Sequence, residues 1–296
     1  MPQRLKIRHS TVYRYRRPVT FGEHRAMFRP RDSHDLRVLD ARLALSPPGD
    51  VRWIHDVFSN SIALITFDQP AAELRFDSVI EIEHYGLSDP EMMLREYAAG
   101  YPFRYDNDQV PDLLPTLQCH YPDPDGAIGA WARQFLDQAE STNTEELLIR
   151  ITRAIKQQFV YQERAIHGTQ APTATLSLGS GTCRDFALFM IEAVRSLGLA
   201  ARFVTGYLYD PALDGEGPGL EGAGATHAWV QVYLPGAGWI EFDPTNGLIG
   251  GTNLIRVGVA RDPRQAVPLQ GSYGGAASDF MDMTVEVKVT KAAESP

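Results

Sequence analysis

The first 85 residues contain short stretches in which apolar and polar side chains alternate, the two-residue period of a half-buried β-strand. Turn-forming residues separate these stretches at Pro30, at residues 47–49 and at residues 68–70. The predicted strands are residues 5–15, 38–46, 61–67 and 74–85. Several short strands at this spacing are typical of a β-sandwich, so we expect one at the start of the chain.

The pattern changes after residues 86–125, a Pro- and Asp-rich stretch that we expect to be a linker. Apolar residues then recur with helical spacing over residues 127–139 and 144–159. Thr142 or Asn143 can cap the second of these helices. Glu145 and Glu146 fall in its first turn, where the helix dipole favours acidic side chains.

A third helix is predicted to begin at Cys183, directly after the turn sequence Gly-Ser-Gly-Thr. Thr182 can act as its cap, and Asp185 three residues later completes a capping-box pattern. Gly198 is placed to end this helix. One helical face is expected to carry Phe186, Met190, Ala193, Val194 and Leu197.

Residues 227–243 are predicted to form a β-hairpin whose turn is the Pro-Gly-Ala-Gly sequence at 235–238. If the loop has five residues, Tyr233 faces Trp239, and Asp243 lies diagonal to His227 on the same face. Diagonal neighbours are about 7–8 Å apart at Cα, so the carboxylate would reach the imidazole. A four-residue loop would place Asp243 on the opposite face.

The remaining segments complete an α+β fold. We expect a strand around residues 202–209, a loop-rich region at 250–275 and a last strand at 283–289. The predicted organisation is an N-terminal β-sandwich domain, residues 1–100, followed by a core, residues 120–296. In that core the helix that begins at Cys183 packs on an antiparallel sheet.

Cys183 is the residue with the clearest chemical potential. In the first turn of a helix its thiol meets unsatisfied backbone N–H groups and the positive end of the helix dipole. Such a position can lower a thiol pKa from about 8.5 toward roughly 3.5–7.5. A nucleophile also needs a base and a group that orients the base, and the hairpin offers His227 and Asp243 for these tasks.

Four sequence segments resemble the transglutaminase-like superfamily, a branch of the papain-like cysteine enzymes. They are Gly-Thr-Cys-Arg-Asp-Phe-Ala at 181–187, residues 195–207, His-Ala-Trp at 227–229, and Gly-Trp-Ile-Glu-Phe-Asp-Pro-Thr at 238–245. The resemblance implies a nucleophilic Cys183, His227 as general base and acid, and Asp243 as the group that orients His227. It also suggests Tyr161 as a donor to the oxyanion, beside the Cys183 backbone N–H. Bacterial members carry an N-terminal β-domain.

Each of these residues also has an ordinary structural interpretation. A lone cysteine is usually a small buried hydrophobe, a histidine beside a tryptophan is often a satisfied core residue, and an Asp before Pro is often a turn residue. Tyr161 is equally well explained as a core aromatic. Only the combination of motifs in order and spacing favours catalysis. Cys119 is expected to be a linker thiol.

Composition argues against several classes of binding partner and cofactor. A net charge of −9 argues against a nucleic-acid partner, because phosphate binding needs clustered Lys and Arg. The basic residues up to Arg17 alternate with apolar ones and predict a solvated strand face. We expect no membrane segment and no signal peptide. Two cysteines predict a reducing, cytoplasmic location without a disulfide. The dispersed histidines predict no metal and no cofactor.

The predicted reaction is acyl transfer through a Cys183 thioester, with a peptide or protein as substrate. A cysteine peptidase or amidase is the favoured function, because the sequence has no evident Ca²⁺ site and a bacterial-style layout. A transglutaminase with an amine acceptor would use the same residues. A non-catalytic binding module on the same scaffold is the third possibility, and it would not need Cys183, His227 and Asp243 together.

Overall fold

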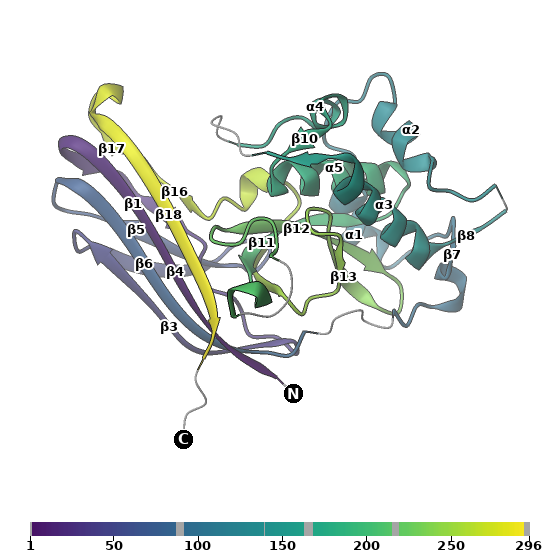
Figure 1. The fold of residues 1–296 in the computed structure, drawn as a ribbon, viewed down its shortest axis with the longest axis horizontal. Coiled ribbons are helices and arrows are strands. Elements are labelled where there is room, and N and C mark those ends of the chain that lie inside the picture. Colours follow the sequence, from purple (N-terminus) through teal and green to yellow (C-terminus); the bar gives the residue numbers. More distant parts are fainter. Residues whose placement is uncertain (1, 87–91, 139, 163–167, 215–218, 293–296) are drawn as a thin grey trace.

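The computed structural model describes residues 2–86, 92–138, 140–162, 168–214 and 219–292. The chain has the expected α+β fold. Figure 1 shows layers of long strands on one side of the molecule and the helices on the other, with β11, β12 and β13 between them. No helix in the described ranges combines the length and apolar character that crossing a bilayer requires.

The N-terminal strands form two packed sheets, which confirms the predicted β-sandwich. One sheet has the order β3 (Leu36–Ser46), β6 (Ala71–His84), β1 (Gln3–Phe21), with β17 (Tyr273–Gly274) and β18 (Phe280–Lys291) also paired to β1. The other has the order β16 (Leu269–Gln270), β2 (His24–Ala26), β5 (Ser61–Thr66), β4 (Asp50–His55). Between them lies a core that includes Tyr15, Phe21, Ile65, Leu74 and Phe76. Within residues 1–85 the sequence analysis missed β2, which is very short, and β4, which is largely exposed; it also missed the two-residue strands β16 and β17 in the region expected to be loop-rich.

The last strand lies on the N-terminal sheet rather than on the core. β18 runs antiparallel to β1, from the pair Leu5–Lys291 to the pair Tyr15–Phe280. This placement differs from the expected division, in which residues 120–296 formed one unit. The alternation of residues 283–289 predicted a strand correctly. It carried no information on the partner, because a period of two fits any sheet with one buried face.

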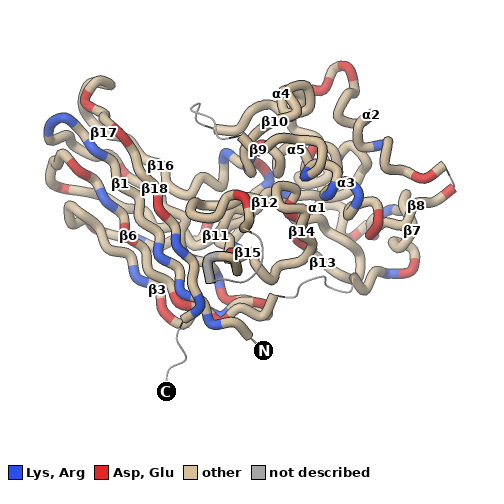
Figure 2. Tube along the Cα trace, in the orientation of Figure 1, with Lys and Arg blue, Asp and Glu red and all other residues tan. Residues whose placement is uncertain are grey.

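Several charged residues of β1 form ion pairs with neighbouring strands. Figure 2 shows Lys and Arg interspersed with Asp and Glu along β1, β6 and β18. Lys6 forms an ion pair with Glu81 at 2.9 Å, and Arg14 forms one with Asp282 at 2.9 Å. The basic N-terminal stretch is therefore a paired strand surface, as its alternation with apolar residues indicated.

The second half of the chain folds helices against a five-stranded sheet. The strand order is β14 (Leu248–Ile249), β13 (Gly238–Asp243), β12 (His227–Leu234), β11 (Ala201–Leu208), β15 (Leu254–Ala260). The helices are α1 (Val110–Leu117), α2 (Ala127–Arg133), α3 (Thr144–Gln158), α4 (Pro172–Leu178) and α5 (Cys183–Ser196). α5 is in the middle of this half, against β11 and β12 on one side and α2, α3 and α4 on others.

Several helix features match the sequence and others do not. Asn143 caps α3 by accepting a hydrogen bond from the Glu146 backbone, as expected. α5 was predicted to have one apolar face, but it is buried on nearly all sides from Asp185 to Arg195 because three helices cover it. The helix predicted over residues 127–139 ends at Arg133, and residue 139 is outside the described ranges. The predicted linker contains α1, and the loop-rich region contains β15.

One hydrophobic core continues from the sandwich into the second half of the chain. It contains Leu5, Ile7 and Ile82 of the sandwich sheet together with Tyr207 of β11 and Val257 of β15. The Tyr207 hydroxyl also lies 3.0 Å from Nδ1 of the buried His9 on β1. The sandwich thus packs directly behind the sheet that carries the candidate active site.

Candidate active site

The hairpin has the register in which His and Asp meet. Tyr233 pairs with Trp239, as expected, and Leu234 pairs with Gly238, so the loop is residues 235–237, three residues rather than five, in the same register. The ladder ends at the pair Val230 with Phe242, which leaves Asp243 next to the start of β12. His227 Nε2 lies 2.9 Å from Asp243 Oδ2, and both side chains are completely buried.

Asp243 is fixed by the turn that follows it. Its Oδ1 accepts a hydrogen bond from the Thr245 backbone at 2.9 Å, the geometry of an Asx-turn. Its Oδ2 accepts a second bond from Asn246 Nδ2 at 2.8 Å. The turn interpretation of Asp243 and the catalytic interpretation are therefore compatible, since one carboxylate serves both purposes.

Asn246 is a site residue that the sequence analysis missed. Besides Asp243, its side chain binds the backbone of Glu221, with Oδ1 accepting from the Glu221 N–H at 2.9 Å. Asn246 thereby connects the Asp243–His227 pair to the loop that precedes β12. The available signal was the Asp-Pro-Thr-Asn-Gly run at 243–247, which reads as a turn and gives no indication of a second partner.

Electrostatics favour a charged His227. Burial lowers the pKa of His227, but the charge and hydrogen bond of Asp243, with a contribution from Cys183, raise it to about 10. For Asp243, burial raises the pKa, but His227, Asn246 and the Thr245 backbone together lower it below its usual value. An imidazolium–carboxylate pair is the expected state at neutral pH.

The second imidazole nitrogen is left for the thiol. His227 Nδ1 is buried, and no described residue forms a hydrogen bond of normal geometry with it, although Cys183 is close enough to raise the pKa of the ring. A Cβ on Gly222 would lie 2.8 Å from Nδ1, and Gly222 has φ +86°. A glycine there keeps the space beside Nδ1 open, and any side chain would fill it.

The predicted capping box positions Cys183 at the first residue of α5. Thr182 Oγ1 accepts from the Asp185 backbone, and Asp185 Oδ2 accepts from the Thr182 backbone at 2.8 Å. The fully buried Asp185 also binds the Gln170 backbone at 2.8 Å. A Cβ on Gly181 would lie 2.8 Å from Cβ of Asp185, so the turn before Cys183 requires glycine. Asp185 is a structural cap, as predicted.

Tyr161 lies beside the turn that leads to Cys183. It belongs to the short strand β9 (Val160–Tyr161), which pairs in parallel with β10 (Ser180–Gly181), and Tyr161 is opposite Gly181. The Tyr161 side chain is half-buried. Its backbone therefore pairs with a residue that is two positions before Cys183 in the chain. Its role as an oxyanion donor stays a prediction.

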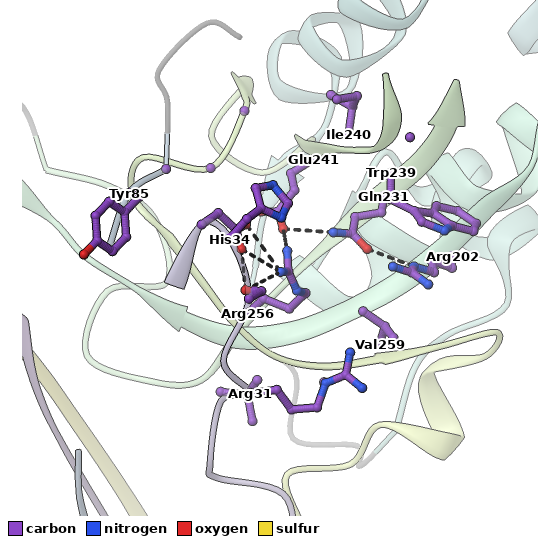
Figure 3. Close-up of a pocket in the computed structure, with 18 of the residues that line it drawn as sticks. Arg31, His34, Tyr85, Arg202, Gln231, Trp239, Ile240, Glu241, Arg256 and Val259 are labelled. Atoms are coloured by element: carbon purple, nitrogen blue, oxygen red, sulfur yellow. Dashed lines mark hydrogen bonds and ion pairs between the residues drawn. The ribbon is translucent and has the colours of Figure 1, made fainter. Parts of the chain in front are cut away.

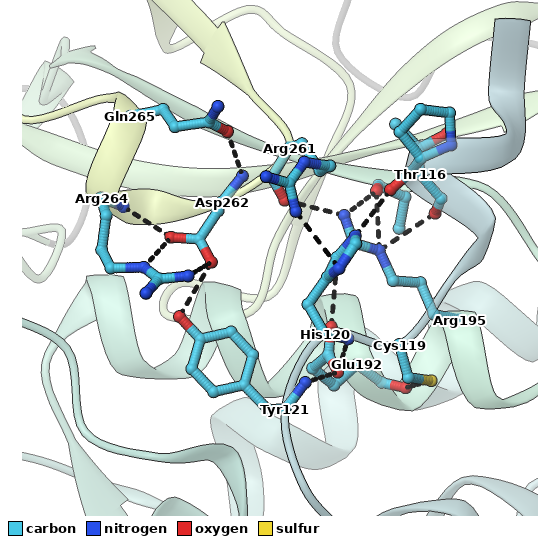
Figure 4. Close-up of polar contacts among 12 residues, drawn as sticks. Thr116, Cys119, His120, Tyr121, Glu192, Arg195, Arg261, Asp262, Arg264 and Gln265 are labelled. Atoms are coloured by element: carbon cyan, nitrogen blue, oxygen red, sulfur yellow. Dashed lines mark hydrogen bonds and ion pairs between the residues drawn. The ribbon is translucent and has the colours of Figure 1, made fainter.

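A buried ion pair anchors the other end of α5. Figure 4 shows Glu192 and Arg195 at the centre of contacts that link α5 to the segment after α1 and to the end of β15. Arg195 Nη1 lies 2.9 Å from Glu192 Oε1, and Arg195 also donates to the carbonyls of Thr116 and Arg261. Because both charged groups are fully hydrogen-bonded, the pair holds α5, and with it Cys183, in one orientation.

Cys119 has none of the features that would activate a thiol. It is exposed, and its closest polar partner is the Glu192 carbonyl at 3.9 Å from Sγ. Partial burial, followed by the negative charge of Glu192, raises the pKa of this thiol above its ordinary value. Across the described residues, no group of three His, Cys, Asp or Glu side chains is arranged to hold a metal ion.

Comparisons with known proteins agree with this architecture. Residues 5–83 match the family described as the bacterial transglutaminase-like N-terminal region, and residues 130–244 match the transglutaminase-like superfamily. The second match spans Cys183, His227 and Asp243. An uncharacterized protein of Mycobacterium tuberculosis is 29% identical over 96% of this chain and 92% of its own length. An uncharacterized protein of Mycobacterium leprae is 27% identical over 96% of this chain and 98% of its own length.

A solved structure shares the whole fold. The crystal structure of a candidate cysteine protease from Cytophaga hutchinsonii superposes with a TM-score of 0.69 at 19% identity, covering 100% of this chain and 93% of that one. The likeness includes the N-terminal strands as well as the core. With these two family matches, one following the other along most of its length, the chain belongs to the transglutaminase-like superfamily and carries the N-terminal region of its bacterial members.

Proposed function

We propose that this protein is a cysteine hydrolase that cleaves an amide bond in a peptide or protein through a thioester on Cys183. The observation that carries the proposal is the buried 2.9 Å contact between His227 Nε2 and Asp243 Oδ2, which leaves Nδ1 for the thiol. Structural residues do not need this arrangement. A fully buried His–Asp pair beside a cysteine at a helix start is costly unless its charges are used.

The first half-reaction forms the thioester. The Cys183 thiolate attacks the carbonyl carbon, and the resulting oxyanion is stabilised by backbone N–H groups at the start of α5. The Cys183 N–H is the first donor, and Tyr161 is the predicted second one. His227 then donates its Nδ1 proton to the leaving amine as the C–N bond breaks, while its Nε2–H remains hydrogen-bonded to Asp243.

The second half-reaction hydrolyses the thioester and regenerates the free enzyme. Neutral His227 takes a proton from water through Nδ1, and the resulting hydroxide equivalent attacks the thioester carbonyl. Collapse of this intermediate expels the Cys183 thiolate and releases the carboxylic acid. Asp243 favours the imidazolium at both stages, since it raises the pKa of His227. In a transglutaminase an amine would replace the water at this point.

The proposal is tested by intact-protein mass spectrometry with a small activated acyl donor, such as the nitrophenyl ester of an N-blocked amino acid. We expect one acyl group to appear on Cys183 and to be lost by hydrolysis. Cys119→Ala should acquire the same adduct, whereas Cys183→Ala should not.

Addition of a primary amine separates the alternatives. A hydrolase releases mainly the free acid, while a transglutaminase releases mainly the amide product. Absence of any adduct with amide-derived and ester probes would favour the non-catalytic binding module and overturn the proposal. The cytoplasmic location and the absence of nucleic-acid and membrane partners stay predictions.

A further inference from the structure

A large cavity lies away from the candidate active site. Its volume is about 480 Å³, within the range of small-molecule sites, and it is bordered by the segment 31–35, by β13 and by β15. The described residues that line it do not include Cys183, His227 or Asp243. Figure 3 shows side chains from these segments converging on it, with Gln231 and Arg202 from the central strands β12 and β11.

Arg202 is held in one orientation but has spare hydrogen-bond donors. Its Nε donates to Gln231 Oε1 at 2.8 Å, and its guanidinium stacks over the Trp239 ring at 3.9 Å from the centroid. Gln231 is in turn fixed by Glu241 Oε1 at 3.0 Å. Among the described residues no hydrogen bond or ion pair is made by the terminal nitrogens of Arg202. A preorganised guanidinium of this kind suits a carboxylate or a phosphate.

The acidic groups of the cavity are already engaged elsewhere. Glu241 and Asp35 both bind Arg256, at 2.7 Å and 3.2 Å. Asp32 is exposed and accepts a hydrogen bond from the Val38 backbone at 2.9 Å. Glu241 and Asp35 therefore make their direct ion pairs with Arg256 and none with Arg202, on which Glu241 acts only through its charge.

A second arginine borders the same cavity. Arg31 is exposed, and its side chain donates a hydrogen bond from Nη1 to the Ser59 carbonyl at 2.7 Å. Burial and then the positive charge of Arg256, partly offset by Glu241, lower the pKa of Arg202 to about 9, and Arg31 adds the smallest contribution in the same direction. A bound anion would therefore stabilise the charged form of Arg202.

We propose that this cavity is a binding site for a small oxyanion ligand, whose carboxylate or phosphate group is held by Arg202 and Arg31. The site is separate from the thiol chemistry. Along β12, Trp229 lies between Gln231 and His227 on the same strand face, and its indole N–H donates to Glu241 at 3.0 Å. The buried Trp229 ring therefore occupies the space between the two sites.

The test is calorimetric titration of the full chain with sodium phosphate and, separately, with sodium glutarate, against chloride at equal ionic strength. We expect saturable binding of at least one of the two anions. Arg31→Gln and Arg202→Gln should each weaken it by about tenfold or more, since each removes a charged hydrogen-bond donor. Comparison of the two anions identifies the preferred oxyanion.

Arg16→Gln is the matched control. Arg16 is an exposed arginine that also donates to one backbone carbonyl, that of Ser278 at 3.0 Å, far from the cavity. It should bind the anion as tightly as wild type, and so should Cys183→Ala, which has lost the proposed nucleophile. Because Arg31 is on the surface, its variant is expected to fold even if Arg202→Gln does not. No saturable binding, or equal affinity in wild type and Arg31→Gln, would overturn the site and leave the acyl-transfer proposal untouched.

Discussion

Replacing Cys183 by alanine is expected to lower acyl-transfer activity by roughly 10⁶-fold, the loss seen when a covalent nucleophile is removed from a catalytic triad. No other described side chain at the start of α5 can form the thioester. The fold should survive, because the substitution removes one sulfur atom from a position where the backbone is fixed by the Thr182–Asp185 capping box. The measurement is turnover of an acyl donor, with thermal unfolding to verify the structure.

Cys119→Ala is the control for this experiment. It removes the other cysteine of the chain, which lies in the segment after α1 and is 3.9 Å from the Glu192 carbonyl of α5. This variant should keep wild-type turnover within a factor of about two or three. If Cys183→Ala retained activity while remaining folded, the nucleophile would have been assigned to the wrong residue.

Asp243→Asn is expected to reduce turnover by roughly 10²–10⁴-fold, the range typical for disturbing a general acid–base pair. An amide can still accept from or donate to His227 Nε2, but it no longer supplies the negative charge. Burial, which lowers the pKa of His227, then dominates. Because the first half-reaction needs a proton on Nδ1, the alkaline limb of the pH–rate profile should move to lower pH in the variant.

The free energy of unfolding should also fall as the pH rises. The pKa of His227 is raised from 6.5 to about 10 in the folded protein. Its contribution to the free energy of unfolding is therefore complete below about pH 6.5 and is lost as pH rises toward about 10. Asp243→Asn should flatten this decline.

Glu241→Gln is the control for the pH–rate experiment. It alters a buried carboxylate two residues earlier on β13 and should leave the pH–rate profile unchanged. An identical shift in both variants would show that the effect is general strand damage.

Local sequence patterns predicted the elements that carry the candidate site. The capping box at Thr182 and Asp185, the hairpin register and the His–Asp contact each depend on residues close together in the chain, and all are present. Their geometry follows from short-range rules of capping and strand pairing. That α5 lies next to the hairpin could be predicted only with the help of the family resemblance.

Features that depend on distant contacts were not predictable in the same way. The strand pattern of residues 283–289 did not reveal pairing with β1, and the sequence of α5 did not reveal that three helices would cover its polar side. The loop before β12 folds back over His227. This fold places Gly222 beside the imidazole and brings Glu221 to Asn246, which follows β13. Arg202 resembled an ordinary strand residue, since only the assembled cavity shows its spare donors.

The reactivity of Cys183 relative to Cys119 tests the central claim most directly. Cys119 is exposed, whereas Cys183 is only 7% exposed, so accessibility alone favours labelling of Cys119. His227 lies beside Cys183, and a histidine next to a cysteine activates it as a nucleophile. Labelling with iodoacetamide at about pH 6.5, where an ordinary thiol is mostly protonated, is followed by peptide mass spectrometry in wild type and His227→Gln. The account predicts that Cys183 reacts faster than Cys119 in wild type and loses this advantage in His227→Gln; equal or slower labelling of Cys183 in wild type would contradict it.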